Sequence, residues 1–117
     1  MKLLIVGHLE GYISQAGQIA IKRGAKVVHC ETMDQAIVAL RGGDGIELVM
    51  IDVKQDVKQF IEQLKAERMA IPVIACGIGN DKHSVVRAIK SGAKEYVPLP
   101  PDPEITRMEY DMKDQLI

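Results

Sequence analysis

Short apolar runs alternate with amphipathic stretches along the chain, and this alternation constrains the fold more than any other feature. Each run is much shorter than an ordinary helix and suits a strand that is buried on both faces. In the intervening stretches, apolar residues recur every three or four positions, as they do along one face of a helix. The runs that predict strands are Leu3–Val6, Lys26–Cys30, Glu47–Asp52, Ile71–Cys76 and Glu95–Val97.

Strands that alternate with helices predict a parallel sheet, because consecutive parallel strands need a long crossover and a helix supplies it. Right-handed crossovers then place helices on both faces of the sheet. With five strands we expect an α/β flavodoxin-like three-layer sandwich, with strand order 2-1-3-4-5 and about five helices. The chain of 117 residues is expected to form a single domain, 1–117.

Local signals mark the ends of several predicted helices. Thr32 precedes Gln35 by three residues, which is the spacing of a capping box, and Gly42 follows the helix that this spacing predicts. The stretch from Lys54 to Arg68 predicts another helix. Its apolar face is formed by Val57, Phe60, Ile61 and Leu64.

The two helices nearest the C-terminus have narrower apolar faces. In the helix that begins after Asp81, we expect Val85, Val86 and Ile89 to be the buried side chains. The last helix, about 103–117, is more polar than the others. This helix is either frayed, or its apolar stripe is buried by a dimer partner or by a downstream domain. Its apolar stripe consists of Ile105, Met108, Met112 and Leu116.

Composition excludes several classes of function. The net charge is −1 and no polybasic run occurs, so we expect no direct contact with nucleic acid and none with a membrane surface. No apolar run approaches the roughly 18 residues of a membrane span, and no secretory signal is evident. We expect a cytoplasmic protein in which Cys30 and Cys76 are buried free thiols.

The topology predicts where a functional site would lie. Ligands of open parallel α/β sheets bind outside the carboxyl ends of the strands, at the switch point between the first and third strands. Asp52 ends a buried run at that edge, and we expect its nearest partner to be His8, through a hydrogen bond. The residues expected at this edge are Gly7, His8, Glu10, Asp52, Val53, Gly77, Leu99 and Pro100.

Three segments resemble the receiver domains of bacterial response regulators, which are CheY-like. Leu48–Asp52 is similar to their phosphoacceptor strand and Pro72–Gly77 to their fourth strand. Gly92–Pro100 is similar to a segment that normally reads Gly-Ala-x-x-Tyr/Phe-x-x-Lys-Pro. The resemblance makes Asp52 the phosphoacceptor position and Tyr96 the aromatic switch residue. Receivers also carry an acidic pair, a hydroxyl and a lysine, and this sequence has Gly7-His8, Gly77 and Leu99 in their places.

More narrowly, residues 6–11, 75–79 and 92–103 resemble the N-terminal domain of FlbD-type flagellar transcriptional regulators. The resemblance implies sigma-54-dependent control of flagellar genes in a two-component or phosphorelay setting. It also implies that an AAA+ domain and a DNA-binding domain are attached in the full-length protein.

The substituted positions are poorly suited to phosphoryl transfer. Gly7 supplies no magnesium ligand, and the nitrogen of His8 suits zinc or copper better. Gly77 lacks the hydroxyl and Leu99 lacks the cation that would hold a phosphoryl oxygen. Each missing contact removes about 2–4 kcal/mol of transition-state stabilisation. We therefore expect a pseudo-receiver without a resident metal or cofactor, and not an enzyme.

The favoured prediction is a regulatory protein–protein interaction module that is not controlled by ordinary aspartyl phosphorylation. It would bind a protein partner, or form a homodimer, through about Asp81–Ile117. One alternative is a functional receiver that is phosphorylated on Asp52. Another is a corrinoid-like binding domain, because His8-Leu-Glu-Gly11 has the His-x-x-Gly spacing, although Val6 stands where the aspartate of that motif would be.

Overall fold

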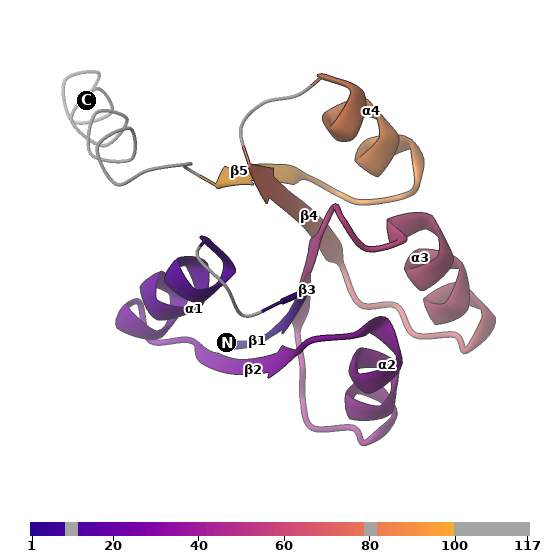
Figure 1. The fold of residues 1–117 in the computed structure, drawn as a ribbon. Coiled ribbons are helices and arrows are strands. Elements are labelled where there is room, and N and C mark those ends of the chain that lie inside the picture. Colours follow the sequence, from indigo (N-terminus) through magenta and orange to yellow (C-terminus); the bar gives the residue numbers. More distant parts are fainter. Residues whose placement is uncertain (9–11, 79–81, 100–117) are drawn as a thin grey trace, which may run out of the picture.

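A parallel five-stranded sheet with helices on both sides forms the protein (Figure 1). The computed structural model describes residues 1–8, 12–78 and 82–99. The strands are β1 (Lys2–Val6), β2 (Lys26–Cys30), β3 (Leu48–Asp52), β4 (Val73–Ile78) and β5 (Tyr96–Leu99). The helices are α1 (Tyr12–Lys22), α2 (Met33–Arg41), α3 (Val57–Ala66) and α4 (Lys82–Lys90).

The strand order is β2-β1-β3-β4-β5, which confirms the predicted flavodoxin-like architecture. Four of the expected helices lie within the described residues. The expected last helix, about 103–117, lies outside them, together with its apolar stripe. The strands begin and end within about two residues of the predicted runs, because the apolar pattern follows burial closely.

Side-chain caps fix the starts of α2 and α3. Thr32 Oγ1 accepts a hydrogen bond from Gln35 N at 3.2 Å, and the Gln35 side chain accepts one from Glu31 N at 3.0 Å. Asp56 Oδ1 likewise accepts from Gln59 N at 3.0 Å. A cap of this kind typically stabilises a helix by about 1 kcal/mol. The capping box predicted from Thr32 and Gln35 is therefore present, with the return bond one residue earlier than in the usual form.

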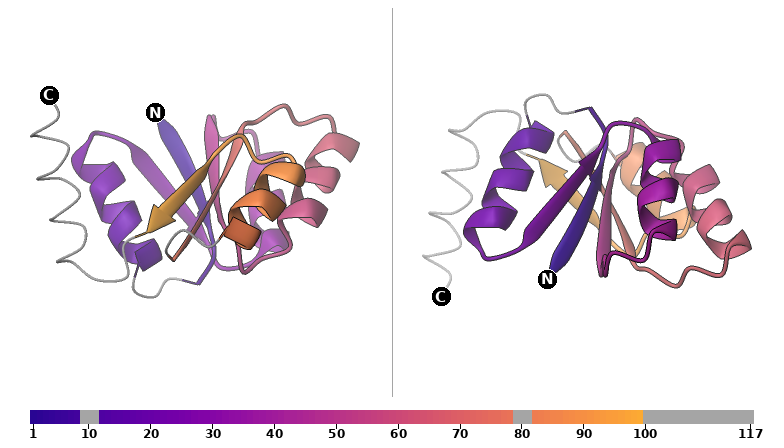
Figure 2. Two further views of the ribbon diagram at one scale, coloured as in Figure 1. Left: turned by 90° about the horizontal axis from the view of Figure 1, so that it is seen from above. Right: turned by 90° about the horizontal axis from the view of Figure 1, so that it is seen from below.

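Two apolar clusters fill the space between the sheet and its helices. One contains Leu4, Ile37, Phe60 and Ala88, so it joins β1 to α2, α3 and α4. The other contains Leu3, Ile5, Ile13, Cys76 and Leu99, so it joins the sheet to α1. Neighbouring strand residues belong to different clusters because successive side chains point to opposite faces. Figure 2 shows α1 on one side of the sheet and the other three helices on the opposite side.

The buried face of α4 differs from the prediction. Ala88 is its buried residue, with 3% of its surface exposed, whereas Val86 is 50% and Ile89 45% exposed. Val85 is half-buried. Positions two apart lie about 200° apart around a helix, so turning Ala88 toward the sheet turns Val86 toward solvent. The prediction that Val86 and Ile89 are buried was therefore wrong.

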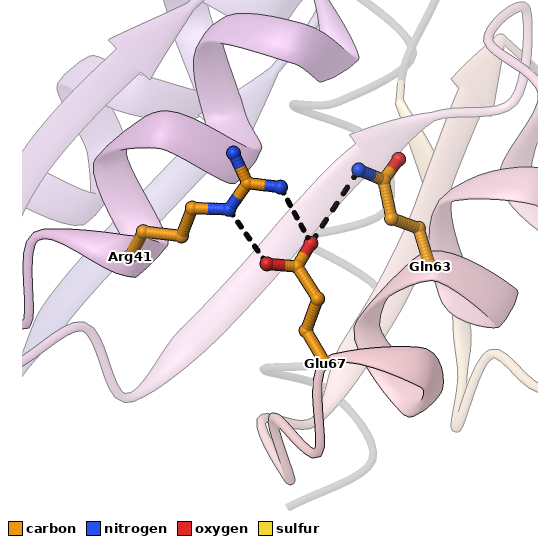
Figure 3. Close-up of polar contacts among 3 residues, drawn as sticks. All are labelled: Arg41, Gln63 and Glu67. Carbon is orange, nitrogen blue, oxygen red and sulfur yellow. Dashed lines mark hydrogen bonds and ion pairs between the residues drawn. The ribbon is translucent and has the colours of Figure 1, made fainter.

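An ion pair links α2 and α3 at their C-terminal ends (Figure 3). Arg41 Nε and Nη2 donate to the two carboxylate oxygens of Glu67 at 2.6 and 3.0 Å, and Gln63 donates to the same carboxylate at 3.5 Å. Hydrogen bonding to Arg41 holds the pKa of Glu67 below its usual value, and the same bond raises the pKa of Arg41. Helices run antiparallel to the strands that precede them, so this contact lies at the edge of the sheet away from the strand ends that matter below.

Candidate functional site

The strand register brings the predicted positions together at one edge of the sheet. Asp52 at the end of β3 pairs with Cys76 of β4. The next residue, Gly77, pairs with Pro98 of β5, and Ile78 pairs with Leu99. On the other side of β3, Ile51 pairs with Val6, which precedes Gly7. Gly7, Asp52, Gly77 and Leu99 therefore meet at the carboxyl ends of neighbouring strands, as the topology predicted.

Asp52 is held by the turn that follows it. Its Oδ1 accepts a hydrogen bond from Lys54 N at 3.0 Å, and its carbonyl accepts one from Gln55 N at 2.9 Å. The first of these is an Asx-type bond to a backbone N–H two residues ahead. The predicted hydrogen bond from His8 is absent from the described part of the chain. His8 is exposed, and the backbone N–H of Lys54 takes its place as the donor to Asp52.

Gly7 approaches Asp52 so closely that it leaves no room for a side chain. A Cβ atom at Gly7 would lie 2.9 Å from Asp52 Cβ, and the φ angle of Gly7 is +151°. Both the space and the backbone conformation therefore favour glycine. An acidic side chain at this position would need a different path for the end of β1.

His29 fixes the backbone of Gly7 from the other side. Its Nε2 lies 2.6 Å from the Gly7 carbonyl oxygen, and Gly7 N donates to the Cys30 carbonyl at 2.9 Å. A carbonyl oxygen only accepts, so the hydrogen atom of this bond lies on Nε2. His29 was not among the predicted site residues. The signal for it was the strand order, which places the end of β2 directly beside the end of β1.

The side chain of Tyr96 occupies the space next to Gly77. A Cβ atom at Gly77 would lie 2.6 Å from Val53 Cγ2 and even closer to the Tyr96 hydroxyl oxygen. The ring of Tyr96 therefore crosses from β5 toward the end of β4 and brings its hydroxyl above Gly77. Tyr96 is half-buried and packs against the cluster that contains Phe60. A side chain at position 77 would overlap Tyr96 and Val53, so the glycine at this position leaves the space to them.

Leu99 is a core residue. Only 8% of its surface is exposed, and it packs in the apolar cluster on the α1 side of the sheet. A lysine ammonium placed at the same depth would lose its hydration against apolar neighbours. Leu99, expected from the resemblance at the lysine position of receivers, therefore belongs to the packing between β5 and α1.

The hollow at this edge is small. It has a volume of about 80 Å³. Asp52 contributes its acidic group, and Lys54 contributes a cation from an exposed side chain. Small-molecule sites usually measure about 300–1,000 Å³. The hollow is lined by Ile13, Asp52, Val53, Lys54, Gly77, Ile78 and Leu99.

Cys76 lies beside Asp52 on the neighbouring strand and is a buried thiol, as predicted. Burial, together with the negative charge of Asp52, raises the pKa of Cys76 to about 12. Its Sγ lies 3.5 Å from the Ile51 carbonyl, to which it donates a weak hydrogen bond. Cys30 is also free and buried, and burial raises its pKa. Both thiols therefore stay protonated at neutral pH.

Two further features concern the described residues as a whole. Among residues 1–8, 12–78 and 82–99, no group of three or more His, Cys, Asp or Glu side chains could hold a metal ion. None of the helices in these ranges has the length and apolar character needed to cross a membrane. Two of the expected site residues, Glu10 and Pro100, lie outside the described residues.

Sequence comparison connects the chain to a transcriptional regulator. No model of a known protein family matches it. It is 50% identical over 105 residues to the transcriptional regulatory protein FlbD of Caulobacter vibrioides. The match covers 90% of this chain and 23% of FlbD, so the chain spans about a quarter of that protein.

Structural comparison agrees on the fold. A two-component response regulator from Clostridium difficile superposes with a TM-score of 0.71 at 16% identity, over 96% of this chain and 93% of that one. An atypical orphan response regulator, described as having a phosphorylation-independent regulatory mechanism, gives a TM-score of 0.66 at 17% identity, over 84% and 81% of the two chains. The strand order and the similarity to FlbD identify the chain as a receiver domain of the FlbD type.

Proposed function

We propose that this domain is a regulatory protein–protein interaction module of a transcriptional regulator, and that aspartyl phosphorylation does not control it. The observation that carries the proposal is the position of the Tyr96 hydroxyl above Gly77. In receivers, the corresponding aromatic residue moves inward on activation. Here the inward space is already filled, and no phosphoryl group is needed to admit Tyr96 because position 77 has no side chain.

The electrostatics of the strand ends support the same proposal. A phosphorylated side chain carries a charge of about −1.5 to −2, which needs nearby cations or a metal. At the predicted positions, Gly7 and Gly77 have no side chains and Leu99 is buried and apolar. Lys54 reaches the hollow, but its exposed side chain has no hydrogen bond or ion pair that fixes it within the described residues. In this proposal the carboxylate of Asp52 has a structural role: it accepts a hydrogen bond from the backbone of the turn after β3.

The regulatory setting rests on similarity to FlbD, which is a transcriptional regulatory protein. By that similarity, the domain is attached to an AAA+ domain and a DNA-binding domain in a cytoplasmic, sigma-54-dependent regulator of flagellar genes. The domain itself makes no contact with DNA in this proposal. Its signal is a protein contact on the surface that includes α4 and β5, the described part of the predicted interface.

Acetyl phosphate with Mg²⁺ tests the proposal on the wild-type chain and on Asp52→Asn. Intact mass spectrometry is expected to show no gain of a phosphate on either protein. The same samples are examined by ¹⁹F NMR with beryllofluoride, and no bound fluoride signal is expected. A phosphate gain on the wild type that Asp52→Asn abolishes would instead establish the phosphorylated-receiver alternative. A functional measurement accompanies the phosphorylation assay. Transcription from a target promoter by the full-length regulator should be unchanged by Asp52→Asn.

A further inference from the structure

The side of α4 that turns toward α3 consists of small and polar residues. Four positions at helical spacing share this side, namely Ser84, Arg87 and Ala88 of α4 and Ser91 just after it. A helix normally places its larger apolar residues next to the core, but in α4 Val86 and Ile89 are half exposed and Ala88 is buried instead. Side chains as short as serine and alanine do not fill the space between two helices, so a groove is left beside α3.

This groove has the size of a small-molecule site. Its volume is about 410 Å³, within the range of roughly 300–1,000 Å³ that is usual for such sites, and far above that of the hollow at Asp52. Figure 1 shows α3 and α4 as neighbours on the same side of the sheet. The groove is closed at one end by the turn Val53–Asp56 that follows β3, and along its sides by the start of α3 and by α4.

Three cations from three separate segments line the groove. Lys54 comes from the turn after β3, Lys58 from α3 and Arg87 from α4. Among the described residues, none of these side chains forms an ion pair or a hydrogen bond with another side chain, since the ion pair found there joins Arg41 to Glu67. The groove is therefore positive although the whole chain has a net charge of −1.

The other polar groups of the groove are compatible with an anion. The Asp56 carboxylate also lines it, but Asp56 Oδ1 already accepts a hydrogen bond from Gln59 N in the cap of α3. Three cations against one carboxylate leave two positive charges in excess. Ser91 Oγ donates its hydrogen to the Arg87 carbonyl at 2.7 Å, so it is not a donor to a ligand. The half-buried amide of Gln55 supplies a neutral donor beside the cations.

We propose that the groove between α3 and α4 binds a small organic molecule that carries two phosphoryl groups. Arg87 contacts one phosphoryl group through its planar fork, and Lys54 and Lys58 contact the other as point charges. Each phosphoryl group brings a charge of about −1.5 to −2, so two of them match the three cations. The carbon part of the molecule lies against Val53, Val57 and Ala88. This binding site goes beyond the proposed function and stands whether or not Asp52 is phosphorylated.

The groove shares a wall with the strand ends, which gives a ligand a way to act on them. Val53 and Lys54 line both the groove and the hollow at Asp52. Lys54 N donates to Asp52 Oδ1 at 3.0 Å, and Val53 Cγ2 lies beside the Cβ position of Gly77. A phosphoryl group that draws the Lys54 ammonium into the groove also takes this cation away from Asp52. Ligand binding should therefore be felt at Asp52 without any change of covalent bonds.

The test uses the full 117-residue chain labelled with ¹⁵N, at about 0.15 M salt, where charges more than about 8 Å apart are largely screened. ADP is the probe, without added metal. It should shift the amide signals of Lys54, Lys58 and Arg87 to saturation, and those of Asp52 to a smaller extent. AMP should bind at least about tenfold more weakly and adenosine not detectably, while pyrophosphate should displace ADP. Shifts confined to other helices, equal binding of adenosine and ADP, or failure of pyrophosphate to compete would overturn the proposal.

Charge removal provides the matched control. Lys58→Gln combined with Arg87→Gln should weaken ADP binding about tenfold or more, because two exposed cations are lost without disturbing the core. Lys22→Gln combined with Lys26→Gln removes the same charge on α1 and β2 and should change the affinity by less than about twofold. Equal weakening by the two pairs would show that ADP responds only to the overall charge, and would refute a site in the groove.

Two further measurements separate this site from other phosphate contacts. Asp52→Asn should retain ADP binding, whereas loss of binding in this variant would assign the phosphoryl groups to the strand ends and refute the groove. A DNA duplex should not displace ADP, because a groove of this volume admits a small molecule and the chain lacks an extended basic surface. Displacement of ADP by the duplex at lower concentration than by pyrophosphate would refute a small-molecule site.

Discussion

The hydroxyl of Tyr96 lies where a side chain on Gly77 would begin. The two residues belong to neighbouring parallel strands, and the absence of a side chain at one permits the inward position of the other. By the proposal above, Gly77 stands where receivers carry a hydroxyl, and its lack of a side chain does more than remove a contact to a phosphoryl group. It makes room for an aromatic side chain that, by the proposal above, no longer needs a signal to enter.

Gly77→Thr is expected to expel Tyr96 from this position. The new side chain would overlap both the Tyr96 hydroxyl and Val53 Cγ2, and overpacking of this kind costs about 1–3 kcal/mol. Loss of the nuclear Overhauser effects between the Tyr96 ring and the Val53 methyl groups would report the movement. The double variant Gly77→Ala with Tyr96→Phe is the control, since removal of the hydroxyl should recover part of the stability lost in Gly77→Ala. Intact Overhauser effects in Gly77→Thr would contradict the proposed overlap.

Gly7→Ala should lower the free energy of unfolding by about 1–3 kcal/mol. The added Cβ would lie 2.9 Å from Asp52 Cβ, on a backbone whose φ is +151°. Gly45→Ala is the matched control, because Gly45 also has a positive φ, +77°, and nothing lies within 4 Å of its Cβ position. Urea denaturation should show the larger loss for Gly7→Ala, and adding Asp52→Gly should recover the part that is due to crowding. Equal losses of stability in Gly7→Ala and Gly45→Ala would show that only the unfavourable backbone conformation matters and that crowding against Asp52 contributes nothing.

Leu99→Lys should destabilise the fold without restoring phosphorylation. Leu99 packs with Ile13 and Cys76, so a lysine must either bury its charge or leave a gap in this cluster. We expect a loss of about 2–4 kcal/mol in urea denaturation, against less than about 1.5 kcal/mol for the volume-conserving Leu99→Met. A phosphate gain by Leu99→Lys in the acetyl phosphate assay would show that the site lacks only its cation.

Much of the fold could be predicted because it depends on the periodicity of apolar residues. The strands and their order follow from the run pattern and from the rules for parallel crossovers, and so does the meeting of Gly7, Asp52, Gly77 and Leu99. The side-chain details could not be predicted in the same way. Whether Lys54 N or His8 binds Asp52 depends on the path of a turn, and the inward position of Tyr96 depends on space that only packing reveals.

The exposed face of α4 shows a second limit of predicting buried side chains from the spacing of apolar residues. Val85, Val86 and Ile89 were all assigned to the core, but a short helix can bury only part of its circumference. The structure turns Ala88 toward the sheet and leaves Val86 and Ile89 half exposed. Apolar residues spread around such a helix cannot all be buried by one sheet, and those that remain outside become candidates for a partner contact.

The thiol of Cys76 provides a pH test of the packing beside Asp52. Its pKa is raised from 9.0 to about 12 by burial and by the charge of Asp52. A raised pKa in the folded state means that the neutral thiol contributes stability below pH 9, and that this contribution is lost as the pH rises from about 9 toward 12. The free energy of unfolding of the wild type should therefore fall more steeply between pH 9 and 11 than that of Cys76→Ala. Asp52→Asn removes the smaller of the two causes, so the pKa of the folded thiol should fall and the loss of stability should end at a lower pH than in the wild type. Parallel curves for the wild type and Cys76→Ala would show that the thiol titrates normally and that this part of the sheet is open to solvent.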